Sequence, residues 1–141
     1  MPSDLLLKAV NAIHQPIFRL SKGRIAGRGA GMPMVALTTT GRKSGQRRTV
    51  MLSSPLVDGD TVVLVASRGG DDRHPDWFHN LVADPAVEIE MDGRSRPMTA
   101  RVAEGDERED LWARLTAAHD NYAGYQRKTD RRIPVVVLAP R

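Results

Sequence analysis

The chain has 141 residues, 40% of them hydrophobic and 27% charged, a composition typical of one soluble globular domain. Because it contains no cysteine, disulfides, thiolate catalysis and cysteine-bound metals are excluded. No apolar run approaches the roughly 20 residues of a membrane span, and no secretory signal is recognisable, so we expect a cytoplasmic protein. The net charge of +4 favours an anionic partner, but aromatic residues make up only 4% of the chain, which argues against nucleic acid.

The N-terminal segment is predicted to form an amphipathic helix over residues 4–20. Its apolar side chains recur at alternating steps of four and three, which places them on one helix face. A basic, glycine-rich connector follows, so we divide the chain into a segment 1–32 and a barrel domain 33–141. Two interpretations stay open: the helix packs on the domain, or residues 4–28 make a peripheral contact with the inner face of an anionic membrane. The apolar residues of this pattern are Leu6, Val10, Ile13, Ile17 and Leu20.

From Met34 onward the pattern changes to short runs of β-branched and apolar residues, which are typical of strands. Asp58-Gly59 and Asp92-Gly93 are hairpin turn signals between such runs. Short antiparallel hairpins with few helices indicate a mainly β, α+β fold: a small β-barrel with flanking helices. The predicted strands are residues 34–40, 48–56, 61–66, 87–91, 96–102 and 133–138, and the predicted helices are 76–83, 106–119 and 122–128.

Residues 42–48 form the most informative segment, because they carry four cations directly after the strand predicted at 34–40. Gly41 and Gly45 free the backbone for a tight loop. Fixed guanidinium groups and exposed backbone N–H donors are well suited to phosphate or carboxylate oxygens. The segment therefore predicts a polyanionic small-molecule ligand, and a solvated basic turn is the alternative that these residues alone leave open.

Four ordered motifs make the chain similar to a known family. They lie at residues 37–45 (LTTTGRKSG), 66–70 (ASRGG), 74–81 (HPDWFHNL) and 125–138 (YQRKTDRRIPVVVL). In this order and spacing they resemble the deazaflavin-dependent nitroreductases, also described as F420H2-dependent quinone reductases, over about residues 34–138. The resemblance implies a split β-barrel like the FMN-binding barrels. It also implies coenzyme F420, a deazaflavin whose tail carries a phosphate and a run of glutamates.

The resemblance also implies where the cofactor lies. The basic segment would hold the phosphate and glutamate tail, the following strand would lie against the deazaflavin, and the ASRGG segment would line its ring and ribityl chain. Two residues of the HPDWFHNL motif would complete the site. The cofactor residues implied in this way are Arg42, Lys43, Ser44, Arg48, Val50, Met51, Ala66, Ser67, Arg68, Gly69, Gly70, Trp77 and Asn80.

The implied reaction is hydride transfer from reduced F420 to a quinone or similar apolar acceptor. A deazaflavin supplies the hydride itself, which agrees with a chain that has no evident nucleophile or metal site. The implied catalytic residues are Ser67, Tyr122 and Tyr125. Ser67 would be the proton donor or hydrogen-bond partner, and the two tyrosines would wall the acceptor pocket. Two alternatives stay open: a carrier that binds F420 or an apolar ligand without turnover, and an FMN-binding barrel.

Two positions depart from the family pattern. Ser53 stands where a nitroreductase branch has a tyrosine near its substrate, which puts reduction of nitro compounds in doubt. Arg68 replaces a lysine typical of the glycine loop and keeps its positive charge. The acidic and histidine residues within 71–79 fit no metal-binding spacing, so we predict no metal. The sequence does not fix the oligomeric state.

Overall fold

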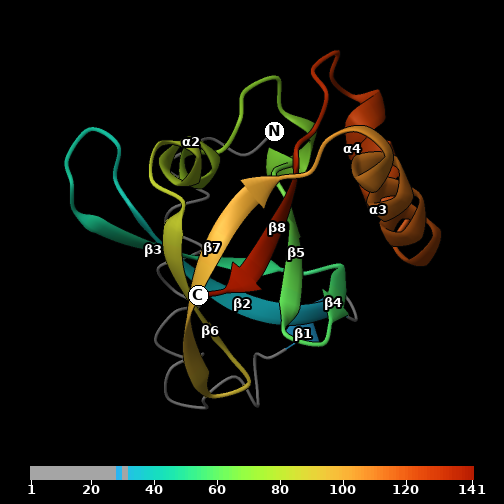
Figure 1. The fold of residues 1–141 in the computed structure, drawn as a ribbon. Helices are drawn as coiled ribbons and strands as arrows, with labels where there is room; N and C mark the ends of the chain where they lie inside the picture. The colour runs from blue at the N-terminus through green and yellow to red at the C-terminus, as the bar shows by residue number, and fades with distance from the viewer. Residues whose placement is uncertain (1–27, 30–31) are drawn as a thin grey trace.

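Eight antiparallel strands form one strongly curled sheet in the computed structural model, which describes residues 28–29 and 32–141 (Figure 1). The strand order is β1-β2-β6-β7-β8-β5-β4, and β3 pairs with β2 outside this path. Within the described residues no pairing joins β3 to β4, so the barrel is split. The strands are β1 (Arg28–Gly29), β2 (Met32–Thr40), β3 (Arg47–Ser53), β4 (Leu56–Asp58), β5 (Thr61–Val65), β6 (Ala86–Met91), β7 (Arg94–Val102) and β8 (Val135–Pro140). The helices are the 3-10 turn η1 (Arg68–Gly70), α2 (Asp76–Ala83), α3 (Gly105–Ala118) and α4 (Asn121–Arg127).

Side chains alternate in direction along the strands and so build two apolar layers. Leu64 of β5 and Val136 of β8, which are paired, point into the barrel and pack with residues of β2, β6 and β7. Their neighbours Val65 and Val135 point outward and pack with residues of α3 and α4. Because both faces of β5 and β8 are buried, these strands read as continuous apolar runs and not as alternating ones.

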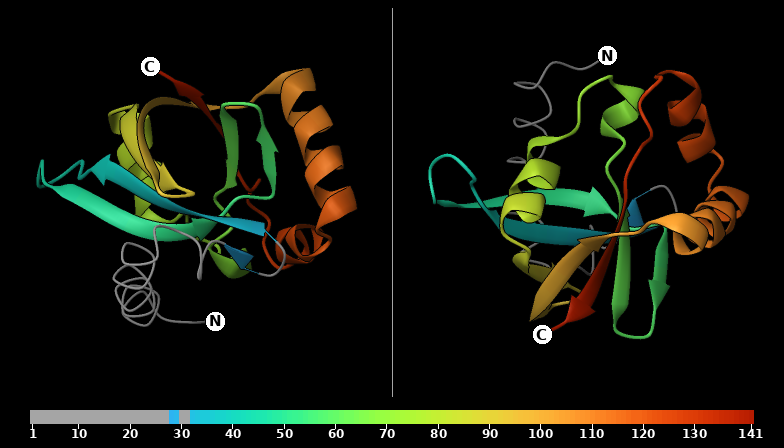
Figure 2. Two further views of the ribbon diagram at one scale, coloured as in Figure 1. Left: turned by 90° about the horizontal axis from the view of Figure 1, so that it is seen from below. Right: turned by 45° about the horizontal axis from the view of Figure 1, so that its top comes forward.

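The helices cover two sides of the barrel (Figures 1 and 2). α2 packs against β2 and β7, where Trp77 and Leu81 join the barrel core. α3 and α4 lie together on the other side, over the outward faces of β5 and β8. No helix within residues 28–29 and 32–141 is long and apolar enough to cross a membrane.

The predicted elements agree with the structure in type and order, and the fold class is confirmed. The helix predicted at 76–83 has the bounds of α2, because Pro75 opens it and Pro85 prevents its continuation. The helix predicted at 4–20 lies outside the described residues, and the membrane contact proposed for it stays a prediction. Part of the connector is described, since β1 pairs with the start of β2.

The strand predicted over 48–56 is wrong at its C-terminal end. β3 stops at Ser53, and Ser54 and Pro55 turn the chain before β4 begins. The buried Ser54 hydroxyl donates to the carbonyl of Val63 at 2.7 Å, and proline has no N–H to offer a strand ladder. β3 therefore ends at this corner, and one edge of β3 has no partner strand in the described part of the chain.

Candidate functional site

The basic loop, residues 42–48, lies in the exposed connection between β2 and β3 (Figure 1). Backbone hydrogen bonds close the turn: the Gly41 amide donates to the Gln46 carbonyl at 2.7 Å, and the Gly45 amide donates to the Gly41 carbonyl at 2.8 Å. Gly45 has a φ of +72°, which glycine adopts without strain. The Ser44 hydroxyl accepts from the Gln46 amide at 3.1 Å, so its own O–H stays available as a donor.

The basic loop presents cations that no carboxylate of the described residues neutralises. Arg42, Lys43 and Arg48 are exposed, and none of them forms an ion pair with an acidic side chain of the described residues. Arg47 differs, because its guanidinium lies 3.7 Å from the Glu88 carboxylate. The three cations without a partner are therefore available to an anionic ligand.

Asn80 of α2 fixes the start of the basic loop. Its side chain is 8% exposed, accepts from the backbone amide of Arg42 at 3.0 Å and donates to the hydroxyl of Thr39 at 3.2 Å. A buried amide with both ends satisfied in this way stabilises the contact between the helix and the loop. Asn80 therefore joins α2 to the start of the basic loop.

β3 leads from the basic loop to a pocket. Its register against β2 pairs Val50 with Leu37 and Leu52 with Val35, so Arg48, Val50 and Leu52 share one face of the strand. Val50 and Leu52 pack against the barrel core, whereas Arg48 is exposed. Ordinary strand geometry places Arg48 about 13 Å from Leu52. This row of side chains suits an elongated ligand with one anionic end.

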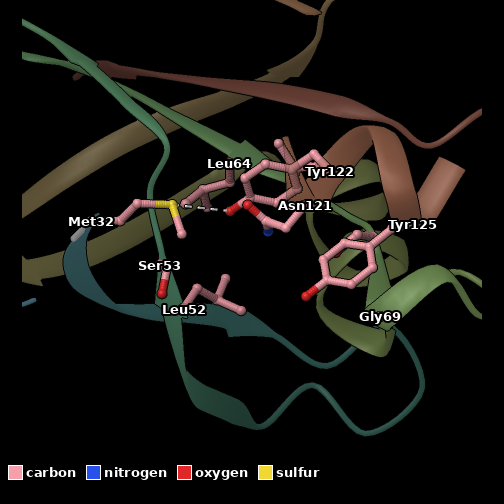
Figure 3. Close-up of a pocket in the computed structure, with 10 residues that line it drawn as sticks. Met32, Leu52, Ser53, Leu64, Gly69, Asn121, Tyr122 and Tyr125 are labelled. Carbon is pink, nitrogen blue, oxygen red and sulfur yellow. Dashed lines mark hydrogen bonds between the residues drawn. The ribbon is translucent and has the colours of Figure 1, made fainter. Parts of the chain in front are cut away.

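The pocket has a volume of about 270 Å³ and lies between β3, β5, η1 and α4 (Figure 3). Four predicted site residues from separate segments of the chain meet here: Ser67, Gly69, Tyr122 and Tyr125. The walls combine apolar side chains with hydroxyl and amide groups, as expected for a site that holds and orients an organic ligand. The lining residues are Met32, Leu52, Ser53, Leu64, Val65, Ser67, Gly69, Asn121, Tyr122 and Tyr125.

The three hydroxyl groups predicted to be catalytic differ in their surroundings. Tyr122 is 5% exposed, and its hydroxyl donates to the Met32 sulfur at 3.4 Å. Burial raises the pKa of Tyr122 to about 12. Within the described residues the side-chain hydroxyls of Ser67 and Tyr125 have no hydrogen-bond partner, and Figure 3 shows the Tyr125 hydroxyl directed into the pocket. These two hydroxyls are therefore available to a ligand.

The ring-side loop, residues 66–71, carries Ser67 and Gly69 to the pocket wall. It packs closely on α4 through Gly70, because a Cβ on Gly70 would lie 2.8 Å from the carbonyl oxygen of Tyr125. Gly70 also has a φ of +85°, in the left-handed region. The shape of this loop therefore sets the distance between η1 and the tyrosines of α4.

Several predicted cofactor residues lie outside the pocket lining. Trp77 and Ala66 are buried in the barrel core. Met51 points to the face of β3 opposite the row that leads to the pocket, where it belongs to a separate apolar cluster. The Arg68 guanidinium contacts the carboxylate of Asp71. The structure therefore does not bring these four residues to the pocket lining.

Two residues that support the site, Arg131 and His74, were not predicted from the sequence, although both lie within the quoted motifs. Arg131 donates to the backbone of the ring-side loop, and His74 lies against the Arg131 guanidinium. Nothing in the sequence distinguishes an arginine that binds backbone carbonyls from one that is solvated. The only available signal was its position inside an ordered motif.

Comparison with known proteins identifies the family. A family model described as F420H2-dependent quinone reductase matches residues 11–140. The F420H2-dependent quinone reductase Rv1261c of Mycobacterium tuberculosis is 41% identical over 133 residues, which cover 92% of this chain and 89% of that protein. The solved structure of an F420-H2 dependent reductase (FDR-A) is 45% identical with a TM-score of 0.67, and covers 75% of this chain and 93% of that one.

Further structures bear on the fold. One described as a domain-swapped dimer is 38% identical with a TM-score of 0.69, and covers 90% of this chain and 96% of that one. A protein of the pyridoxinephosphate oxidase family from Clostridium acetobutylicum is 10% identical with a TM-score of 0.56 over 88% of this chain and 84% of that one, so it shares only the fold. Because the family model and the M. tuberculosis relative both match most of its length, this chain belongs to the F420H2-dependent quinone reductase family.

Proposed function

We propose that this protein transfers a hydride from F420H2 to a quinone-like apolar acceptor, with the deazaflavin ring at the pocket and the anionic tail on the basic loop. Membership of the family makes the chain an F420H2-dependent reductase. The observation that carries the rest is the row Arg48, Val50 and Leu52, which connects cations that have no acidic partner among the described residues to the pocket. A ligand with a planar ring at one end and several negative charges at the other matches this arrangement.

The basic loop fits the tail by charge and by donor geometry. Arg42 and Arg48 present planar guanidinium groups that can bind phosphate or carboxylate oxygens through two parallel hydrogen bonds, and Lys43 adds a point charge. The O–H of Ser44 remains free to donate, since the turn uses only its acceptor side. Asn80 holds the first residue of this loop in place from α2. These donors support the loop as the site of the tail.

The pocket fits the ring and the acceptor by its mixed walls. When bound, the reduced deazaflavin supplies the hydride. Gly69 has no side chain, so a ring can approach the backbone closely at this wall. In this proposal the Ser67 hydroxyl, at the pocket wall, hydrogen-bonds the ring or the acceptor. The Tyr125 hydroxyl, which is directed into the pocket, donates a proton to the acceptor oxygen. The apolar side chains Leu52 and Leu64 favour an apolar acceptor.

The proposal is tested by fluorescence titration with F420 and with FMN, followed by turnover with the soluble quinone menadione. We expect tight, salt-sensitive F420 binding, weak FMN binding and saturable oxidation of F420H2 by the quinone. F420 binding without turnover would indicate a carrier. A preference for FMN, or no F420 binding, would overturn the assignment of the basic loop to the tail.

The two pocket tyrosines are expected to differ as proton donors. Tyr125→Phe should lower kcat for quinone reduction by about 10- to 100-fold, because it removes an acid directed into the pocket. Tyr122→Phe should lower kcat less, because the Tyr122 hydroxyl is committed to the Met32 sulfur and burial raises its pKa to about 12. Steady-state kinetics at saturating F420H2 measure both. A larger loss from Tyr122→Phe would reverse the assignment.

A further inference from the structure

The ring-side loop has an unusual backbone shape, which is held by hydrogen bonds within the loop, by the Arg68–Asp71 side-chain contact and by contacts from outside the loop. Arg68, Gly69 and Gly70 have consecutive positive φ angles of 46°, 65° and 85°, and a non-glycine residue such as Arg68 rarely adopts this conformation. Within the loop the Gly70 amide donates to the Ser67 carbonyl at 2.9 Å and the Asp71 amide donates to the Arg68 carbonyl at 3.2 Å. The position of Ser67 in the pocket depends on this shape.

Arg131, which lies in the segment before β8, binds both ends of the ring-side loop. Its Nη1 donates to the Ala66 carbonyl at 3.2 Å, its Nη2 to the Ser67 carbonyl at 2.8 Å and its Nε to the Asp71 carbonyl at 2.7 Å. Nη1 also lies 3.0 Å from Nδ1 of His74. A single planar guanidinium therefore joins the two ends of the loop to His74, which lies two residues before α2.

We propose that Arg131 is a positioning residue that fixes the ring-side loop, and with it the Ser67 hydroxyl, in the shape that F420 binding requires. This inference rests on the proposed function, since it assigns the loop to the deazaflavin. The three nitrogens of the guanidinium point in fixed, divergent directions toward separate acceptors. A lysine keeps the charge but offers its donors from one point, so it cannot hold both ends of the loop.

His74 makes this support sensitive to pH. A guanidinium is only a donor, so Nδ1 of His74 must accept and the ring must be neutral with its proton on Nε2. Protonation would remove the acceptor and place a second cation against Arg131. Burial lowers the pKa of His74, and the charges of Arg131 and of His79 on α2, whose ring centre lies 5.5 Å away, lower it further. The acidic groups of the adjoining loop are Asp71, Asp72 and Asp76.

The sign of the effect follows from the lowered pKa. The folded state favours neutral His74. The stabilisation of the loop by the Arg131–His74 hydrogen bond is therefore complete above the ordinary histidine pKa of about 6.5. It is lost as the pH falls through the lower pKa that His74 has in the folded protein. The loop should therefore loosen on the acid side of neutrality.

Arg131→Lys and its neighbour Arg132→Lys form a matched pair of variants. Arg132 is exposed and pairs with Glu109 at 2.5 Å, so Arg132→Lys controls for the chemical change alone. We expect Arg131→Lys to raise the Kd for F420 at least about tenfold and to speed deuterium exchange of the Gly70 and Asp71 amides, whereas Arg132→Lys should change neither. Wild-type affinity and exchange in Arg131→Lys would overturn the proposal.

A pH series separates positioning from general stabilisation. As the pH is lowered from about 7.5 to well below the ordinary histidine pKa of about 6.5, the wild type should lose F420 affinity and amide protection in the ring-side loop together, after correction for intrinsic exchange. His74→Gln, whose side-chain oxygen can still accept from Arg131, should lack this acid loss. An equal acid loss in both proteins would overturn the role of His74. If the wild type binds no F420, the proposed function fails. The exchange rates of Arg131→Lys and Arg132→Lys still test whether Arg131 fixes the ring-side loop.

Discussion

Replacing both Arg42 and Lys43 by alanine is expected to weaken F420 binding by about 30- to 150-fold at low salt. Both side chains are exposed and have no acidic partner among the described residues. Each charge-assisted contact with a phosphate or carboxylate in such a loop contributes about 1–1.5 kcal/mol. The salt dependence of the remaining affinity should be shallower than that of the wild type, because fewer charges take part. Fluorescence titration at two salt concentrations measures both effects.

Two controls separate a tail contact from a general loss of charge. The deazaflavin riboside, which lacks the phosphate and glutamates, should bind the wild type and the double variant equally. Arg94→Ala combined with Arg114→Ala also removes two positive charges from the net +4, but from the first residue of β7 and from α3. This second double variant should bind F420 nearly as the wild type does. An equal loss of F420 affinity in both double variants would show that the net charge of the protein, and not a contact with the tail, causes the loss.

The barrel could be predicted because its signals are local. Alternation along β6, hairpin turns at Asp58-Gly59 and Asp92-Gly93, and prolines at both ends of α2 each act within a few residues. The C-terminal end of β3 could not be predicted from such local signals. Its stop depends on a hydrogen bond between Ser54 and Val63, a contact that exists only once β5 is in place.

The candidate site could be predicted only in part, because its residues come together through tertiary contacts. The resemblance implied that both Val50 and Met51 lie against the deazaflavin. Neighbouring residues on a strand point to opposite faces, however, and only Val50 lies on the row that leads to the pocket. Asn80 was predicted to contact the cofactor, which stays a prediction, and its hydrogen bond to the backbone of Arg42 could not be seen in the sequence. An ordered motif identifies a family, whereas the side-chain directions that assign roles follow from strand alternation and packing.

Arg131 illustrates what sequence patterns leave out. Its four acceptors are 57 to 65 residues away in the chain, and three of them are backbone carbonyls, which any residue type supplies. No periodicity or spacing could indicate such a contact. The residues that hold a site in shape are therefore harder to find from sequence than those that line it.

Gly70→Ala is expected to destabilise the protein by about 2–4 kcal/mol. At a φ of +85° any side chain is strained, and the added Cβ would lie 2.8 Å from the Tyr125 carbonyl oxygen and 3.1 Å from two carbon atoms of Lys128. The Tyr125 carbonyl belongs to α4, so the clash can be relieved only if the ring-side loop and the helix separate. Urea unfolding monitored by circular dichroism measures the loss.

Gly59→Ala is the matched control, because Gly59 has a φ of +62° with nothing within 4 Å of the position of an added Cβ. The variant has the same kind of backbone strain, but in the β4–β5 turn, away from the pocket. It should therefore lower the free energy of unfolding by about 1–2 kcal/mol and leave quinone reduction intact. Gly70→Ala should lower kcat/KM at temperatures where it remains folded, because separation of η1 from α4 moves Tyr125 away from Ser67. If the two variants lost equal stability and kept equal activity, the close packing at Gly70 would not set the width of the pocket.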